Sequence, residues 1–420
     1  MSAESATTDD PAAARATGLK KGSIGIVAVI FMAVANAAPP ITAMTGNVPI
    51  AVGFGNGLGA PPAGFLFATI ILTLFALGYV AMARHITTTG AFYGFISHGL
   101  GQTWGGMASG MLATFAYVVF EGSLIGGCAY FANDALKTIF NVDVPWLAIA
   151  VVAIVAIAAL CYFDISLTAA ILGVTLTAEV LILLALAFSV IFSGGGPDGL
   201  MLNQTVLLNN AFESLPAGAF GTAAAAGSMA IGLFFAFWSW VGFETTAVYG
   251  EESRNPKKII PRATIIAVVG LGLFYTFISA MVIAGNGAKA SVETSISASP
   301  LDLFFNLVQT NLGGVLLDVY KGLLVIGSFA CALAFHNAAS RYLYALGREV
   351  PSEKIKSTVG GTHPQARVAV HRVDDPERHH AADRAVVRVL HRGAGARRRR
   401  HAGRHPPPWC PTSTSTGCWR

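Results

Sequence analysis

Charged residues are scarce in this sequence. Asp, Glu, Lys and Arg make up 12% of its 420 residues, whereas apolar residues make up 54%. A typical soluble domain carries about 25% charged residues, which it uses to cover its core with a polar surface. The shortage of charge therefore excludes an ordinary soluble domain of this length and indicates lipid as the solvent.

Motifs that would indicate catalysis or metal binding are missing as well. The five cysteines have neither metal-ligand nor disulfide-framework spacing. Glycine is frequent, but no phosphate-binding loop falls between a strand pattern and a helix pattern. His98 and His336 have no second ligand near them in the sequence, so we interpret both as packing or interface residues. We predict that the protein is not an enzyme and uses no cofactor and no metal.

Long apolar runs dominate the first 350 residues. A bilayer core about 30 Å thick requires about 20 apolar residues per helix. The alternating pattern of barrel strands is absent, and backbone groups in lipid must be paired internally, so we expect these runs to be helices. An all-α integral membrane protein with about eight transmembrane helices is predicted, the runs lying at 24–52, 63–84, 104–132, 145–163, 166–193, 224–250, 262–285 and 314–346.

The distribution of Lys and Arg among the short loops predicts the orientation. With the N-terminus inside, the loops on the cytoplasmic side carry eleven of these residues up to Lys356, and the outside loops carry only Lys137 and Lys289. We therefore expect a multi-pass protein of the cell membrane with a cytoplasmic N-terminus. Residues 1–21 are polar and lack a secretory signal, and we expect them to form a disordered cytoplasmic extension.

The first run is interrupted in its middle. Adjacent prolines, Pro39 and Pro40, follow Asn36-Ala37-Ala38 and precede Ile41-Thr42. Two prolines remove two backbone donors and clash with the preceding turn, so the carbonyl groups that they release need another partner. We predict an unwound segment here; the alternative is a tolerated proline kink.

The sixth run contains a second candidate interruption. Residues 237–246 read Phe-Trp-Ser-Trp-Val-Gly-Phe-Glu-Thr-Thr, which places Gly242 beside an intramembrane carboxylate, Glu244. Ionisable groups at this depth are costly and usually mark a site or a structural pair. The alternative is a continuous helix whose glycine allows close packing.

Interruptions in the first and sixth spans occupy matching places in two five-helix repeats. This pattern is typical of inverted-repeat transporters with a substrate site at the membrane midplane. Half-helix N-termini offer free N–H groups to an anion, and exposed carbonyl groups favour a cation. A zwitterion such as an amino acid satisfies both.

Three segments resemble one transporter family. Phe243-Glu244 with the Glu-Glu-Ser-Arg-Asn-Pro-Lys-Lys-Ile-Ile-Pro-Arg-Ala run of residues 251–263 resembles the sixth-helix signature of the amino acid–polyamine–organocation permeases. Residues 89–93, Thr-Gly-Ala-Phe-Tyr, resemble the segment before their third helix, and residues 335–349 resemble the end of their eighth helix. The likeness covers residues 22–365.

The resemblance implies a leucine-transporter-type inverted-repeat bundle, with discontinuous helices 1 and 6, that moves amino acids or related amines by alternating access. It implies that Trp238 is an aromatic gate over the substrate, that Val241 lines the side-chain pocket and that Glu244 couples the site to the gates. The family often has Gly-Ser-Gly in the first-helix break, where this chain has Ala37-Ala38-Pro39-Pro40, so the substrate type stays open. The candidate substrate-binding residues are Ala38, Pro39, Pro40, Ile41, Thr42, Phe237, Trp238, Ser239, Trp240, Val241 and Gly242.

Two further acids lie deep in predicted spans, Glu121 in the third and Glu179 in the fifth. With Glu244 they are the candidate gating or coupling residues. The alternative for Glu121 and Glu179 is that each is paired or lies near a membrane interface. The fifth span has no lysine, and an isolated serine such as Ser328 usually bonds to its own helix. The sequence therefore leaves both proton and sodium coupling open.

The character of the chain changes after Pro364. Residues 1–365 carry 15 Lys and Arg against 18 acids, whereas residues 366–420 carry 12 Arg against four acids, together with six histidines. We interpret 22–350 as the permease domain, 351–365 as a cytoplasmic loop and 366–420 as a non-native or disordered tail. Synonymous codons allow a frame shift near Gln365, beyond which the shifted frame reads as a ninth apolar helix. A charged tail can also bind nucleic acid or anionic lipid, but we predict no nucleic-acid partner.

We therefore predict a permease that moves a small-molecule substrate, an amino acid or a related amine, across the cell membrane by alternating access. With eight spans the second five-helix repeat lacks its last two members, so we expect impaired transport. The alternatives are a membrane receptor that binds without transport and a nonfunctional truncated product.

Overall fold

The computed structural model of the protein describes residues 25–36, 40–86, 90–163, 165–251 and 253–349. Regular structure within these ranges is helical, and the ranges contain no β-strand, only one isolated bridge. The predicted N-terminal extension, the loop 351–365 and the tail 366–420 lie outside the described residues, so their predicted character stays a prediction.

Within the described residues, six helices are long and apolar enough to cross a membrane. They contain α4 (Ala60–Ala83), α6 (Met107–Phe140), α8 (Ile165–Phe192), α10 (Met229–Trp238) with the 3₁₀-helix η5 (Phe243–Tyr249), α11 (Pro256–Asn286) and α14 (Gly314–Glu349). They coincide with the second, third, fifth, sixth, seventh and eighth predicted runs. The first and fourth runs contain shorter apolar helices, α3 (Pro40–Phe54) and α7 (Trp146–Phe163). The predicted all-α membrane fold is confirmed.

The sixth span is discontinuous, as predicted. Helix α10 ends at Trp238, a turn covers residues 239–242, and η5 continues the span from Phe243. Gly242 has a φ of 107°, a left-handed conformation that only glycine adopts without strain. The predicted interruption of the first span falls on residues 37–39, between α2 (Ile26–Asn36) and α3; these residues lie outside the described residues, so this interruption stays a prediction.

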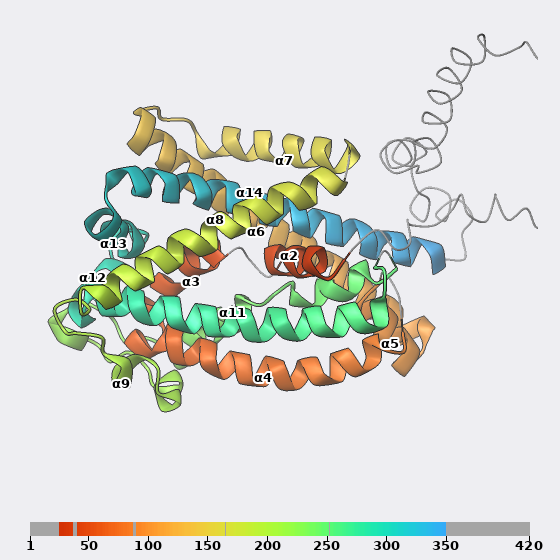
Figure 1. Ribbon diagram of the computed structural model, residues 1–420, viewed down its shortest axis with the longest axis horizontal. Coiled ribbons are helices and arrows are strands. Elements are labelled where there is room, and N and C mark those ends of the chain that lie inside the picture. The colour runs from red at the N-terminus through yellow and green to blue at the C-terminus, as the bar shows by residue number, and fades with distance from the viewer. Residues whose placement is uncertain (1–24, 37–39, 87–89, 164, 252, 350–420) are drawn as a thin grey trace, which may run out of the picture. The chain divides into compact units, whose positions relative to one another are not determined.

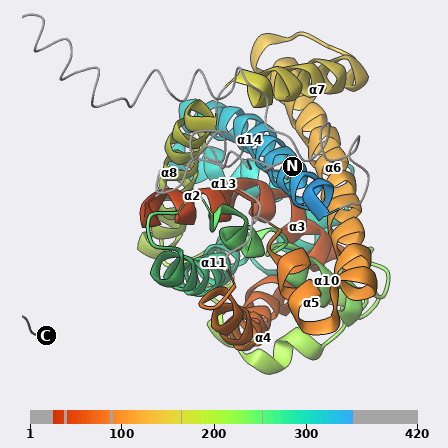
Figure 2. The ribbon, with the colours of Figure 1, turned by 90° about the vertical axis from the view of Figure 1, so that its right-hand side faces the viewer.

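Spans five apart along the chain pack against each other. Helix α4 runs beside α11, and α6 runs beside α14 (Figure 1; Figure 2). In the first and sixth spans, α2 packs against η5 and α3 packs against α10, so these two spans run in opposite directions. Two inverted five-helix repeats give this pairing of first with sixth, second with seventh and third with eighth.

Short helices connect the spans. They are η1 (Gly57–Gly59), α5 (Phe92–Leu100), the π-helical η2 (Gln102–Gly106), α9 (Leu202–Thr205), η3 (Leu208–Phe212), η4 (Ala219–Gly221), α12 (Ala288–Ser295) and α13 (Asp302–Leu312). The last two occupy a segment predicted as an outside loop. Helix α13 buries Leu303, Phe304 and Val308 in the main core, and this burial accounts for its helical form.

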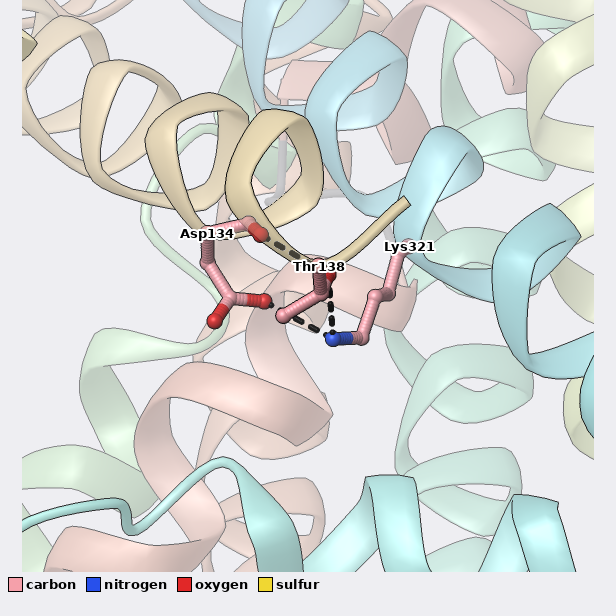
Figure 3. A network of polar contacts seen from close by, with 3 residues as sticks. All are labelled: Asp134, Thr138 and Lys321. Carbon is pink, nitrogen blue, oxygen red and sulfur yellow. Dashed lines mark hydrogen bonds and ion pairs between the residues drawn. The ribbon is translucent and has the colours of Figure 1, made fainter. Parts of the chain in front are cut away.

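A buried cation ties α6 to α14 near the ends of these helices (Figure 3). Lys321 Nζ of α14 donates to Asp134 Oδ2 at 3.1 Å and to Thr138 Oγ1 at 2.9 Å, both on α6. The same amine lies 4.6 Å from the ring centre of Phe305 on α13. Because an unpaired buried cation is costly, this network stabilises the contact between the third and eighth spans.

Candidate functional site

The first and sixth spans meet at Gly242. A Cβ atom added to this glycine would come closer than 3.0 Å to the backbone carbonyl of Asn36, the last residue of α2. Asn36 Nδ2 also reaches the Tyr249 hydroxyl of η5 at 3.5 Å, and on the other side Asn47 Nδ2 donates to Ser239 Oγ at 2.8 Å. The interruption of the sixth span and the end of α2 therefore lie against each other.

The carboxylate of Glu244 is held beside the second interruption. One oxygen accepts the Gly242 N–H at 3.0 Å, and the other accepts the hydroxyl of Tyr117 from α6. The Glu244 backbone carbonyl accepts the hydroxyl of Tyr79 from α4 at 2.5 Å. Movement of η5 would break contacts with both neighbouring spans, so Glu244 joins the second interruption to α4 and α6.

Glu179 lies at the start of α3. This acid of α8 is fully buried, and its Oε2 accepts the Ile41 N–H at 3.4 Å. The first N–H groups of a helix have no partner within the helix and carry the positive end of its dipole. We expected the N–H groups at the start of α3 to bind a substrate carboxylate. In the structure the Ile41 N–H instead donates to the carboxyl group of Glu179.

Three buried polar atoms around the first interruption have no hydrogen-bond partner in the part of the chain that the structure describes. They are Asn36 Oδ1 at the end of α2, Thr42 Oγ1 in the first turn of α3, and Glu179 Oε1. Buried polar atoms are nearly always bonded, so each exception needs an explanation. Each of these three atoms is therefore free to bond to a polar ligand, an ion or water. Ala38 and Pro39, the neighbouring candidate residues, lie outside the described residues.

The candidate residues of the sixth span divide between two faces. Trp238 packs on Phe120 of α6 at a ring-centre distance of 4.5 Å and stacks on Phe234 at 5.3 Å. Trp238 and Val241 are half-buried and join the cluster built around α6 and α14. These two residues can therefore face a ligand between the interrupted spans and the third and eighth spans.

Phe237 and Trp240 turn toward α4 and α11 instead. Trp240 is buried, its ring centre lies 5.3 Å from that of Tyr275, and its Nε1 donates to the Val268 carbonyl at 3.3 Å. Phe237 packs edge-on against Phe67 of α4. In this structure both residues fill the contact with the second and seventh spans.

Glu121 is paired with a histidine that the sequence left without a partner. His336 Nδ1 of α14 lies 3.0 Å from Glu121 Oε1 of α6. His336, interpreted from the sequence as a packing or interface residue, thus lies at the contact between the third and eighth spans, and the structure adds a specific partner for it. A partner 215 residues away leaves no local signal in the sequence.

Comparison with known proteins identifies the family. A family model described as amino acid permease matches residues 24–351. The chain belongs to the amino acid permease family. Membership in this family agrees with the long apolar helices of a multi-pass membrane protein.

Uncharacterized transporters of Mycobacterium tuberculosis and Mycobacterium bovis are 26% identical to the permease over 321 residues, covering 76% of this chain and 64% of theirs. A second uncharacterized transporter of Mycobacterium tuberculosis is 25% identical over 260 residues, covering 57% of this chain and 52% of its own. The chain thus spans less than two thirds of the length of these relatives.

Among solved structures, Mhp1, a nucleobase-cation-symport-1 family transporter with bromovinylhydantoin bound, matches with a TM-score of 0.46 and 12% identity, over 85% of this chain and 73% of that chain.

Proposed function

We propose that the permease binds an amino acid or a related amine where the two interrupted spans meet, and that the complete protein moves it by alternating access. The three unpartnered polar atoms around the first interruption carry this proposal. Two of them, Asn36 Oδ1 and Glu179 Oε1, are acceptors suited to a substrate amine. The third, the Thr42 hydroxyl, can donate to a carboxylate.

Glu179 sets a condition on the substrate carboxylate. The Ile41 N–H already donates to Glu179, so an incoming carboxylate either displaces this side chain or meets it in its neutral form. A substrate with an amine and no carboxylate avoids this competition. Replacing Glu179 with Gln distinguishes the two substrate types: binding of an amine would weaken, whereas binding of an amino acid would be kept or strengthened.

Uptake tests the function itself. The protein to be tested is the frame-restored one, in which the shifted frame is read beyond Gln365. Cells that express it should take up at least one compound from a panel of radiolabelled amino acids and amines. Trp238→Ala should reduce this uptake at least tenfold, because Trp238 is the aromatic gate of the proposed site. Trp146→Ala is the control, since Trp146 at the start of α7 is 57% exposed. Failure of the whole panel to enter would contradict the proposal.

We also propose that the reading frame shifts near Gln365 and that the second five-helix repeat continues in the other frame. The nucleotide sequence around codon 365 tests this, since our proposal requires apolar spans in the other frame. Ligand binding without flux in the frame-restored protein would favour a receptor instead, and undetectable membrane protein would favour a nonfunctional product.

The coupling ion is a further part of the proposal. The Glu121–His336 pair and the unpartnered oxygen of Glu179 are two places where the described membrane segments could take up a proton. Uptake driven by a proton gradient and insensitive to sodium would support proton coupling. Uptake that depends on a sodium gradient alone would instead indicate sodium coupling.

A further inference from the structure

A pocket lies where α2 and α11 begin, at the end of the spans that the sequence predicts to be cytoplasmic. Its volume is about 440 Å³. The lining residues are Gly25, Ile26, Val27 and Ala28 from the start of the first span and Arg254, Lys258, Ile259 and Arg262 from the start of the seventh. The pocket is separate from the proposed substrate site.

Three cations line one side of this pocket. Arg254, Lys258 and Arg262 are spaced four residues apart, so the two within α11 share a face and Arg254 precedes them at the helix entrance. None of the three has an ion-pair partner in the described ranges, although Glu251 lies nearby in the sequence. Like charges at this spacing repel each other, and the N-terminal end of a helix disfavours cations. A bound anion would remove both penalties.

The remaining lining residues are apolar, and the pocket is open to its surroundings. Val27 is 61% exposed, and Ile26 and Ile259 are half-buried. A Cβ atom added to Gly25 would have no atom within 4 Å, so no other described residue fills the space beside this glycine. A ligand with an anionic group and an apolar chain would match both sides, whereas a free phosphate ion would match only the cations.

We propose that this pocket binds an anionic phospholipid, with its phosphate against Lys258 and Arg262 and an acyl chain along Val27. Basic pockets between transmembrane helices on the cytoplasmic side are suited to anionic headgroups. The lipid would hold α2, the first half of the interrupted first span, against α11. The alternative is that these cations only set the orientation of the chain, as Lys and Arg in cytoplasmic loops generally do.

The test measures phosphatidylglycerol bound to the purified full chain in phosphatidylcholine mixed micelles by native mass spectrometry. Lys258→Gln/Arg262→Gln should lower the affinity for phosphatidylglycerol by about 30-fold, at roughly fivefold for each cation. Arg84→Gln/Lys257→Gln is the matched control, because it removes one exposed Arg and one exposed Lys outside the pocket. It should leave the affinity unchanged.

Two further measurements separate a lipid from a free anion. Val27→Ser should weaken phosphatidylglycerol binding by severalfold, and inorganic phosphate should compete only weakly with the lipid. Equal losses in the pocket and control double variants would overturn the proposal in favour of general surface charge. Full competition by inorganic phosphate, with no effect of Val27→Ser, would overturn it in favour of a free-anion site. All the substituted residues are exposed, so the variants should keep the fold.

Discussion

Gly242→Ala is the substitution that most sharply probes the contact between the two interrupted spans. Alanine at a φ of 107° carries a left-handed strain of about 1–2 kcal/mol. Its Cβ would also overlap the Asn36 carbonyl, a backbone atom that can move only if the end of α2 moves. Relief of such overpacking costs a further ~1–3 kcal/mol. The total, about 2–5 kcal/mol, lowers the ratio of folded to unfolded protein by roughly 30-fold or more.

Thermal and denaturant unfolding of the purified variant in detergent would measure this loss. Gly270→Ala is the matched control, since this exposed glycine of α11 has open space around its Cβ position. There we expect no loss and a gain of up to ~1 kcal/mol from helix propensity. If Gly242→Ala unfolded at the same denaturant concentration as the parent, the close approach of Gly242 to the end of α2 would be refuted.

Two more substitutions test the polar contacts. Gly327→Ala on α14 should weaken substrate binding at least tenfold, because the added Cβ would overlap the carboxyl group of Glu179. Gly322→Ala on the same helix is the control: its Cβ would meet open space, so this variant should bind substrate normally. Equal affinities in a radioligand binding assay would show that the position of Glu179 is unimportant. Lys321→Met should lower the free energy of unfolding by ~1–3 kcal/mol, since its partner Asp134 is only 34% exposed. Lys137→Met breaks an exposed pair and should cost less than ~1 kcal/mol, and a larger loss for Lys137 would contradict this ranking.

Most of the fold could be predicted from the sequence because bilayer thickness sets the length of an apolar run. The runs 145–163 and 166–193 match α7 and α8 to within one residue at each end. The discontinuity of the sixth span was also predictable, since Gly242 beside Glu244 breaks the apolar pattern locally. These features are encoded in neighbouring residues.

The polar contacts of the candidate site could not be predicted, because they join residues far apart in the chain. Ile41 and Glu179 are separated by 138 residues, and Tyr117 and Glu244 by 127. Helix α13 was missed for a related reason: its apolar stripe is too short for a transmembrane run, and its helical form depends on burial against the core. The division of the sixth-span residues between two faces likewise depends on which spans pack beside them.

Thiol protection at Thr42 would test most directly whether the first interruption is the substrate site. Thr42→Cys would be placed in a background without the five native cysteines, and its labelling by a water-soluble thiol reagent would be timed with and without the substrate found by uptake. Gly122→Cys on α6, with open space around its Cβ position, is the control. We predict that saturating substrate slows labelling at Thr42→Cys at least tenfold and leaves Gly122→Cys unchanged. Full-rate labelling of Thr42→Cys at saturating substrate would contradict a binding site between the interrupted spans.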